Sequence, residues 1–280
     1  MFEILQKENL CASVVRMVVR APLIAAKARA GQFVILRVSE DGERIPLTVA
    51  DYDPVGGTVT IIFQTVGATT LALSHLGVGD CLQDLVGPLG RATETEGLKK
   101  VAVVGGGVGA AIAYPVAKAL QKQGAEVCCI VGFRNRELVI LQAEFAAVSD
   151  RLITLTDDGS FGEKGLVTDA LRRLIEAGED YDEVIAIGPL PMMKYVSLLT
   201  KEYGVKTVVS MNPIMIDGTG MCGGCRLTVG GQTRFACVDG PEFDGHLVDF
   251  DEAMERSRLY GEQERHAYER TCSLFGQEVR

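Results

Sequence analysis

Three cysteines near the C-terminal end of the chain have the spacing of a metal site. Cys222 and Cys225 are separated by two residues, and Cys237 follows after eleven more. Plant-type [2Fe–2S] sites use the pattern C-x4-C-x2-C with a fourth cysteine farther along. The chain fits this pattern at three places and carries Asp217 where the first cysteine would stand. The spacing therefore predicts a [2Fe–2S] site in which the three cysteines are thiolate ligands and Asp217 is the fourth ligand.

Two alternatives stay open for this segment. Three cysteines, with or without a carboxylate, also suit a structural zinc site. Asp217 could be a solvated loop residue, although it fills the one vacant ligand position. Glycines at positions 218, 220, 223 and 224 let backbone N–H groups point at cluster sulfurs and tune the potential. Because a carboxylate is a harder donor than a thiolate, we hypothesise that Asp217 alters the cluster potential rather than merely holding iron.

A glycine-rich run has the features of a dinucleotide phosphate loop. Gly105, Gly107 and Gly109 follow an apolar stretch and open an alanine-rich segment. Glycines let the backbone approach a pyrophosphate, whose charge is favoured at the N-terminus of a helix. The usual acidic ribose ligand after the next strand is missing, and Arg134 and Arg136 stand there instead. These arginines could meet a 2′-phosphate or be solvated, so NADH and NADPH both stay possible.

Two further segments could bind ligands. The run from Phe63 to Thr70 predicts a strand, a glycine and two threonines at the start of a helix, where hydroxyls and N–H groups converge on an anion. The run 44–48, Arg-Ile-Pro-Leu-Thr, is ordinarily a strand edge with a turn, but together with that anion site it becomes a candidate. The run 187–193 contains a turn after an expected parallel strand, where ligands bind, although Met192 and Met193 could equally be core residues.

The elements that must position these residues fall into three kinds. Short alternating runs separated by turns predict an antiparallel barrel with one helix; the strands are expected over 14–20, 32–38, 58–64 and 81–86, and the helix over 69–76. Alternating apolar strands and helices then predict a doubly wound parallel sheet; strands are expected over 101–104, 126–131, 152–156, 183–187 and 207–210, with helices over 108–121, 137–148, 165–177 and 191–203. A hairpin over 226–229 and 233–236 and a charged helical tail over 249–269 follow.

Composition excludes several classes of protein. The net charge is −9 without a basic stripe, which argues against nucleic-acid binding. No apolar run reaches the roughly 18–20 residues of a membrane span, and the N-terminus lacks a signal-peptide pattern. We therefore expect a cytoplasmic protein, in which the five remaining cysteines pack in the core. The three histidines are unrelated in sequence and form no hydrolytic constellation.

This order of barrel, nucleotide domain and cysteine segment resembles the ferredoxin–NADP reductase-like flavoproteins. The chain is similar to the electron-transfer subunits of dihydroorotate dehydrogenase, and more so to the small (alpha) subunits of NADH-dependent reduced ferredoxin:NADP+ oxidoreductases, which are electron-bifurcating. Asp217 and the long extension after Cys237 favour the second group. The resemblance covers essentially the whole chain and implies four parts: an FAD-binding barrel (1–97), an NAD(P)-binding domain (98–211), a [2Fe–2S] segment (212–245) and a partner-binding helical tail (246–280).

The resemblance also implies site residues. The FAD would be bound by Arg44, Pro46, Leu47, Thr48, Gln64, Val66, Gly67, Thr69 and Thr70, although Arg44 comes one residue earlier than the family's arginine. The NAD(H) would be bound by Gly105, Gly107, Gly109, Asp157, Gly188, Pro189 and Met192.

The implied function is electron transfer in a heterodimer. Hydride would be exchanged with NAD(H) through FAD, and single electrons would pass through the cluster to a larger flavin and iron–sulfur subunit that serves ferredoxin and NADP+. The alternatives are an electron-transfer subunit of dihydroorotate dehydrogenase, sulfide dehydrogenase or hydrogenase, and a non-catalytic sensor of redox state or nucleotide.

Overall fold

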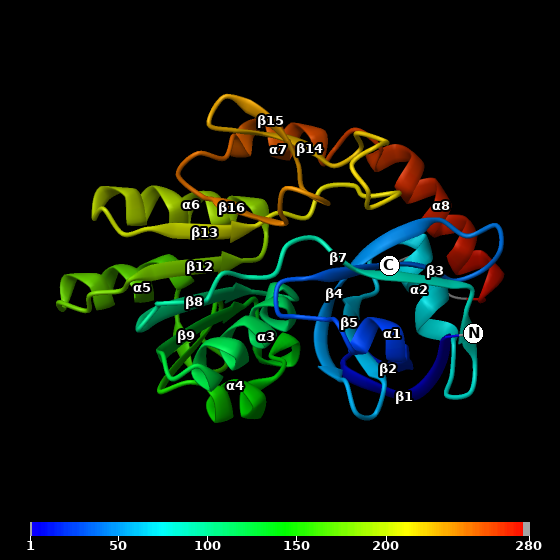
Figure 1. The fold of residues 1–280 in the computed structure, drawn as a ribbon, viewed down its shortest axis with the longest axis horizontal. Coiled ribbons are helices and arrows are strands. Elements are labelled where there is room, and N and C mark those ends of the chain that lie inside the picture. Colours follow the sequence, from blue (N-terminus) through cyan, green and yellow to red (C-terminus); the bar gives the residue numbers. More distant parts are fainter. Residues whose placement is uncertain (1, 277–280) are drawn as a thin grey trace.

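The computed structural model describes residues 2–276 (Figure 1). The first part is a seven-stranded antiparallel sheet in the order β6-β1-β2-β5-β4-β3-β7. Its strands are β1 Phe2–Cys11, β2 Val14–Arg20, β3 Phe33–Arg37, β4 Arg44–Asp53, β5 Thr58–Gln64, β6 Cys81–Leu82 and β7 Asp84–Leu89, with helices α1 Pro22–Ala25 and α2 Ala68–His75. Only Gln83 separates the edge strands β6 and β7, so the sheet curls into a nearly closed barrel.

The second part is a sheet in the order β11-β10-β9-β8-β12-β13-β16. All its pairings are parallel except that of β13 with β16. Its strands are β8 Lys100–Gly106, β9 Glu126–Phe133, β10 Arg151–Thr156, β11 Glu163–Lys164, β12 Glu183–Ile187, β13 Thr207–Ser210 and β16 Glu242–Asp244. Its helices are α3 Gly109–Lys122, the 3-10 turn η1 Arg136–Leu138, α4 Gln142–Val148, α5 Val167–Glu176 and α6 Leu190–Glu202. The strand order reverses between β8 and β12, the place where doubly wound sheets bind ligands.

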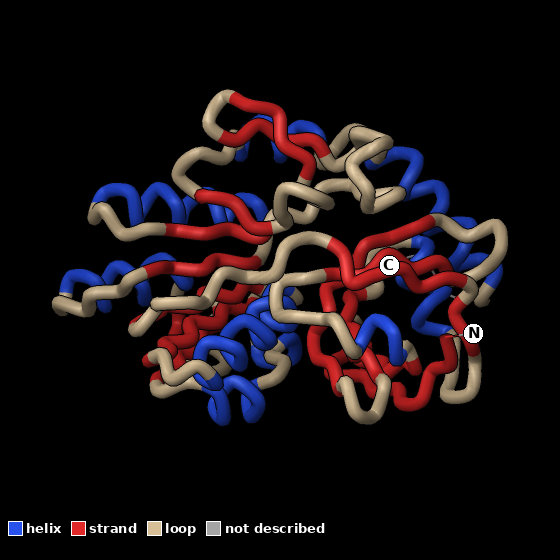
Figure 2. Tube along the Cα trace, in the orientation of Figure 1, coloured by secondary structure: helices blue, strands red, loops and turns tan. Residues whose placement is uncertain are grey.

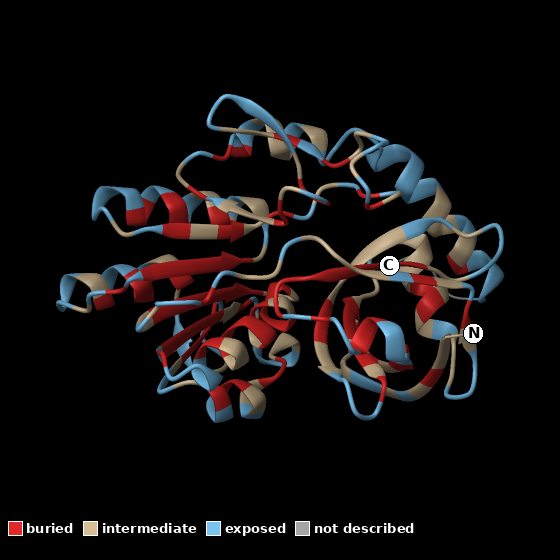
Figure 3. Ribbon diagram, viewed as in Figure 1, coloured by how far each residue is buried: buried red, intermediate tan, exposed pale blue. Residues whose placement is uncertain are grey.

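Alternate residues of each central strand face two different helix layers. On β8, Val101 and Val103 pack with α3 and α4, whereas Ala102 and Val104 pack with α5 and α6. Strands buried on both faces read as unbroken apolar runs, which explains why these strands are visible in the sequence. Figure 3 shows the resulting buried centre of the sheet beneath exposed helix surfaces.

The cysteine segment bridges the two larger parts. A hairpin of β14 Arg226–Val229 and β15 Gln232–Phe235 is followed by β16, α7 Phe250–Arg256 and α8 Gly261–Leu274 (Figure 2). Helix α8 (red in Figure 1) runs back to the barrel and packs on α2. There the rings of His75 and Phe275 stack with centroids 3.8 Å apart. The tail therefore closes the chain onto the domain in which it began.

Several expectations need correction. Strand β1 was not predicted, and β4 was expected only as a strand edge over 44–48. Register shifts within both strands break the two-residue alternation that marks a strand. The single strand expected over 81–86 is two strands, β6 and β7, and the helix α1 is additional. The two-residue β11 and the three-residue β16 were too short to carry a pattern. The last of these adds an antiparallel edge to the parallel sheet.

The fold has no helix that could serve as a membrane span: within residues 2–276, each helix is too short or too polar to cross a bilayer.

Candidate functional site

The glycine loop and the turn after β12 touch each other at the switch point of the parallel sheet. A Cβ on Gly109 would lie 2.5 Å from the carbonyl oxygen of Ile187 and 2.7 Å from Gly188 Cα. A Cβ on Gly106 would lie 2.4 Å from Met192 Sδ. The structure therefore brings together the two segments predicted to hold NAD(H), and absent side chains are what permit the approach.

The two methionines after β12 have different environments. Met193 is 1% exposed and belongs to the core between the sheet and α5–α6. Met192 is half-buried against Gly106 and Gly188, on the loop surface itself. The core interpretation is therefore right for Met193, whereas Met192 stays a predicted nucleotide contact together with Pro189.

Asp157 lies at the same edge of the sheet, two strands away from the glycine loop. Its N–H donates to the carbonyl of Phe133 at the end of β9, so the loops after β9 and β10 are joined. Arg136 is tied to the same region, because its N–H donates to Ser160 Oγ and its guanidinium lies 5.9 Å from the Phe161 ring centroid. Arg134 is exposed. These loops form one end of the predicted dinucleotide site.

The barrel brings the two predicted FAD segments side by side. Thr69, in the first turn of α2, donates to the carboxylate of Glu43, the residue before β4 (3.2 Å). On β4, Pro46 and Thr48 lie on one face and Leu47 on the other, because side chains alternate along a strand. Arg44 is exposed at the start of β4.

The start of α2 is already partly capped. Thr70 Oγ1 accepts hydrogen bonds from the N–H groups of Val66 and Gly67, at 3.1 and 3.0 Å. The same hydroxyl donates to the carbonyl of Gly67. Thr70 therefore shapes the loop that follows Gln64 at the end of β5. The free N–H groups of the first turn and the Thr69 hydroxyl are what the site can offer to a phosphate.

The four predicted iron ligands lie in one loop cluster and form two pairs. Cys225 and Cys237 are buried with their sulfurs 3.2 Å apart. Asp217 and Cys222 form the second pair, because Cys222 N–H donates to Asp217 Oδ2 at 2.9 Å. In residues 2–276 no three His, Cys, Asp or Glu side chains converge on a point for one metal ion. Two pairs are what a two-iron cluster uses, since each iron takes two protein ligands.

The chemistry of the buried pair fits a cluster. Two thiolates on one tetrahedral metal, with metal–sulfur bonds of about 2.3 Å, lie roughly 3.8 Å apart, close to the observed separation of Cys225 and Cys237. Burial, and then the neighbouring sulfur of Cys225, raises the pKa of the Cys237 thiol to about 12. A bound cation would reverse this, because coordinating thiols are deprotonated by the metal. The raised pKa itself does not indicate a metal, since burial also raises the pKa of the core thiol Cys129 to about 12; the fit rests on the separation of the two sulfurs.

Asp217 is oriented by the backbone of its own loop. Its Oδ1 accepts from Thr219 N–H and its Oδ2 from Cys222 N–H, both at 2.9 Å. These bonds, that from Thr219 first, hold the pKa of Asp217 below its ordinary value. A carboxylate that stays ionised and keeps free lone pairs can still coordinate iron, so ligation by Asp217 remains a prediction.

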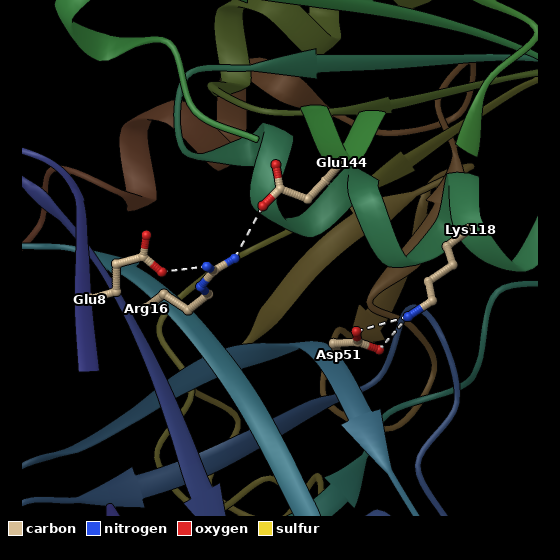
Figure 4. Close-up of polar contacts among 5 residues, drawn as sticks. All are labelled: Glu8, Arg16, Asp51, Lys118 and Glu144. Atoms are coloured by element: carbon tan, nitrogen blue, oxygen red, sulfur yellow. Dashed lines mark hydrogen bonds and ion pairs between the residues drawn. The ribbon is translucent and has the colours of Figure 1, made fainter. Parts of the chain in front are cut away.

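Ion pairs link the barrel to the nucleotide domain (Figure 4). Arg16 on β2 lies between Glu8 on β1 and Glu144 on α4, and the contact to Glu144 is 3.1 Å. Lys118 on α3 donates to both carboxylate oxygens of Asp51 on β4, at 2.9 and 2.8 Å. Both contacts are partly exposed, so each adds only modestly to the stability of the domain contact.

Sequence reasoning did not find every residue that shapes these sites. Glu43 gives no signal of its own except that it directly precedes the run 44–48. Gly218 was expected only to offer an N–H group, whereas it is buried against the barrel. No sequence pattern marks Thr93 or Glu242 as important. The Thr93 hydroxyl nevertheless donates to the Glu242 carboxylate at 2.7 Å and so ties the segment between β7 and β8 to β16.

Known proteins show the same organisation. Residues 212–249 match the family described as the iron-sulfur cluster binding domain of dihydroorotate dehydrogenase B. A dihydroorotate dehydrogenase B (NAD(+)) electron transfer subunit homolog of Thermotoga maritima is 47% identical, over 98% of this chain and 97% of the relative. The electron transfer subunit of Streptococcus pneumoniae R6 is 32% identical, over 86% and 94%.

A solved structure agrees with these relatives. A chain in the structure of an NADH-dependent reduced ferredoxin-NADP oxidoreductase, studied for flavin-based electron bifurcation, superimposes with a TM-score of 0.91 and 47% identity. The match covers 96% of this chain and 97% of that chain. The resemblance inferred from the sequence is therefore confirmed, as are the barrel and the doubly wound sheet.

The matched cluster domain and the shared fold support FAD, an iron–sulfur cluster and NAD(H) as the cofactors. The chain belongs to the family of dihydroorotate dehydrogenase B electron transfer subunits, which are flavin and iron–sulfur oxidoreductase subunits of the ferredoxin–NADP reductase type.

Proposed function

We propose that the chain exchanges hydride with NAD(H) through FAD and passes single electrons through a [2Fe–2S] cluster to a larger subunit of a ferredoxin- and NADP+-dependent, electron-bifurcating oxidoreductase. The observation that carries this proposal is the placement of the cysteine pair. Cys225 and Cys237 share a buried core with Phe33 and Ile35 of the barrel, beside the strand predicted to hold the flavin. The full-length identity to the NADH-dependent ferredoxin-NADP oxidoreductase chain adds support for the bifurcating assignment.

When bound, FAD would convert hydride transfer into single-electron transfer, and the cluster would carry one electron at a time. NADH would give up two electrons and one proton as hydride and leave as NAD+. The electrons would leave singly toward the partner subunit, and the proton would be released to solvent.

The residues of the chain bind the cofactors and the dinucleotide and orient them. The glycine loop and the turn at Gly188 hold the dinucleotide at the switch point, with its phosphates near the N-terminus of α3. The N-terminus of α2 with Thr69 holds the FAD phosphates, and Pro46 and Thr48 lie along the flavin. Asp217, with the three cysteines, holds the cluster.

The division into parts at 1–97, 98–211, 212–245 and 246–280 belongs to the same proposal, with β16 counted as the strand by which the cluster segment joins the sheet. The tail is proposed to contact the larger subunit. Its support is the exposed surface of α8 and of the turn that precedes it, where Leu259 and Tyr260 in the turn and Leu274 on the helix are 60%, 53% and 83% exposed. A cytoplasmic location is proposed because eight cysteine thiols without a disulfide suit a reducing compartment.

A second candidate is the electron-transfer subunit of a dihydroorotate dehydrogenase, favoured by the 32% identity to such a subunit. Purification from the native host decides between the two by the partner that is recovered and by activity. Ferredoxin- and NADP+-linked NADH turnover supports the first, whereas NAD+ reduction by dihydroorotate supports the second. FAD with about equal iron and acid-labile sulfide is expected, and zinc in place of iron would refute both. Failure to oxidise NADH with bound flavin would indicate a sensor instead.

A further inference from the structure

Strand β3 lies between two hydrophobic cores, because one of its faces points into the barrel and the other points toward the cluster segment. Val34 and Leu36 point into the barrel, where they join its interior core. Phe33 and Ile35 point the other way and are 3% and 2% exposed. They belong to a buried core that also contains residues of the cluster segment: Met215, Cys225, Leu227, Ala236 and Cys237. The outer face of β3 is thus the wall on which the cluster segment rests.

The same face of β3 continues directly into the proposed flavin site. In the β3–β4 ladder Ile35 pairs with Pro46, and Phe33 pairs with Thr48. Residues directly opposite each other in adjacent strands have side chains on the same face, with Cβ atoms about 4.5–5.5 Å apart. The residues proposed to line the flavin are therefore one strand away from the residues that carry the cluster segment.

Gly218 is a point at which that segment lies directly against the wall. It is buried, directly follows Asp217 and has a φ of +76°. A Cβ added there would lie 2.6 Å from Leu89 Cδ1 on β7 and 2.9 Å from Ile35 Cδ1. Ordinary contact begins at 3.4 Å, so these two methyl groups occupy the space that a Cβ at position 218 would need. Only a residue without a side chain lets the loop sit this close to the barrel.

We infer that Gly218 is a positioning residue that sets the separation between the flavin site and the cluster, by seating the ligand loop directly on Ile35 and Leu89. The inference rests on the proposed function. Electron transfer becomes steeply slower as two centres move apart. A side chain at 218 requires about 0.8 Å of movement at Leu89 before contact is normal, shared between the ends of the Leu89 and Ile35 side chains and the loop itself. Ile35 is 2% exposed and has little room to turn away, so part of the movement falls on the loop. Close-packed interiors transmit such displacements instead of absorbing them.

The test compares Gly218→Ala with Gly231→Ala in the cofactor-loaded complex. Gly231, in the turn between β14 and β15, is a matched control: its φ of +73° imposes the same backbone strain, but a Cβ there would meet nothing within 4 Å. Stopped-flow absorbance after NADH addition separates flavin reduction from cluster reduction. Gly218→Ala should leave the first rate unchanged and slow the second several-fold, whereas Gly231→Ala should slow neither.

A rescue variant makes the geometry itself testable. Combining Gly218→Ala with Ile35→Val and Leu89→Ala removes both interfering methyl groups and should restore much of the lost rate. A second readout uses the cofactor-free chain, in which thermal unfolding should show that the changes at 218, 35 and 89 are non-additive. The same wall changes combined with Gly231→Ala should be additive. This readout applies even if Gly218→Ala fails to retain its cluster.

Equal cluster-reduction rates in the Gly218 and Gly231 variants, with FAD, iron and sulfide all retained, would overturn the inference and leave the proposed function intact. Additive unfolding effects at 218 and the wall would overturn it as well. Absence of FAD or cluster from the unmodified complex would instead refute the proposed function, and the inference with it.

Discussion

The contact between the two nucleotide loops makes a sharp prediction for Gly109→Ala. The new Cβ would lie 2.5 Å from the carbonyl oxygen of Ile187, about 0.9 Å inside ordinary contact, and the clashing atoms are backbone that cannot rotate away. Overpacking of this kind costs about 1–3 kcal/mol. Alanine recovers roughly 0.5–1 kcal/mol of helix propensity, so we expect a net loss of about 1–2 kcal/mol in unfolding free energy. Displaced phosphate-binding N–H groups should also weaken NADH binding at least tenfold, or about 1.4 kcal/mol.

Gly261→Ala is the matched control. Gly109 and Gly261 are each the first residue of a 14-residue helix, but a Cβ on Gly261 meets nothing within 4 Å. The control should be neutral or slightly stabilising and should bind NADH normally. Denaturant unfolding of the cofactor-free chain and titration with NADH measure the two effects. If both variants have the same stability and the same NADH affinity as the unmodified chain, the steric account of this loop is wrong.

Three further predictions concern other parts of the molecule. Burial raises the pKa of Glu242 to about 7, above its unfolded value, so the folded state loses up to about 3 kcal/mol of stability as pH rises from about 4.5 to 7. Glu242→Gln should flatten this pH dependence of the unfolding free energy. An unchanged pH dependence would contradict the assignment. Asp217→Cys should keep a bound cluster but move its reduction potential in a redox titration, and an unmoved potential would refute the proposed role of the carboxylate. A double-mutant cycle on Asp51 and Lys118 should give a coupling energy below about 1 kcal/mol that shrinks with added salt, because the two side chains are 39% and 43% exposed. A larger coupling energy that does not depend on salt would show that the pair is more than a surface ion pair.

The nucleotide domain was predictable because its signal is local. Fully buried parallel strands are continuous apolar runs, and β12 and β13 appear in the structure with the expected bounds. The barrel was harder. Strands β2 and β5 are short runs rich in β-branched residues and were predicted with the observed bounds, whereas bulges interrupt the pairing of β1 and β4. A bulge depends on how a strand pairs with its neighbour, so the sequence of one strand alone does not reveal it.

The sites divide in the same way. Spacing alone identified the cysteines as candidate cluster ligands, because ligands carried by one loop must stand at fixed intervals in the sequence to reach the same cluster. Spacing could not show that Thr70 caps its own helix or that Met192 covers Gly106 while Met193 is core. Those outcomes depend on which element packs opposite.

The sequence by itself determined the chemistry that the chain can support: cysteine and aspartate donors at cluster spacing, and glycine loops at the ends of apolar strands. These are local properties, written in the order and type of adjacent residues. Only the tertiary structure decided how the sites are arranged relative to one another. Strand β3 carries the barrel interior on one face and the cluster segment on the other, and Gly218 meets Leu89 across a long separation in sequence. Such contacts arise from the packing of whole elements, which no local pattern encodes.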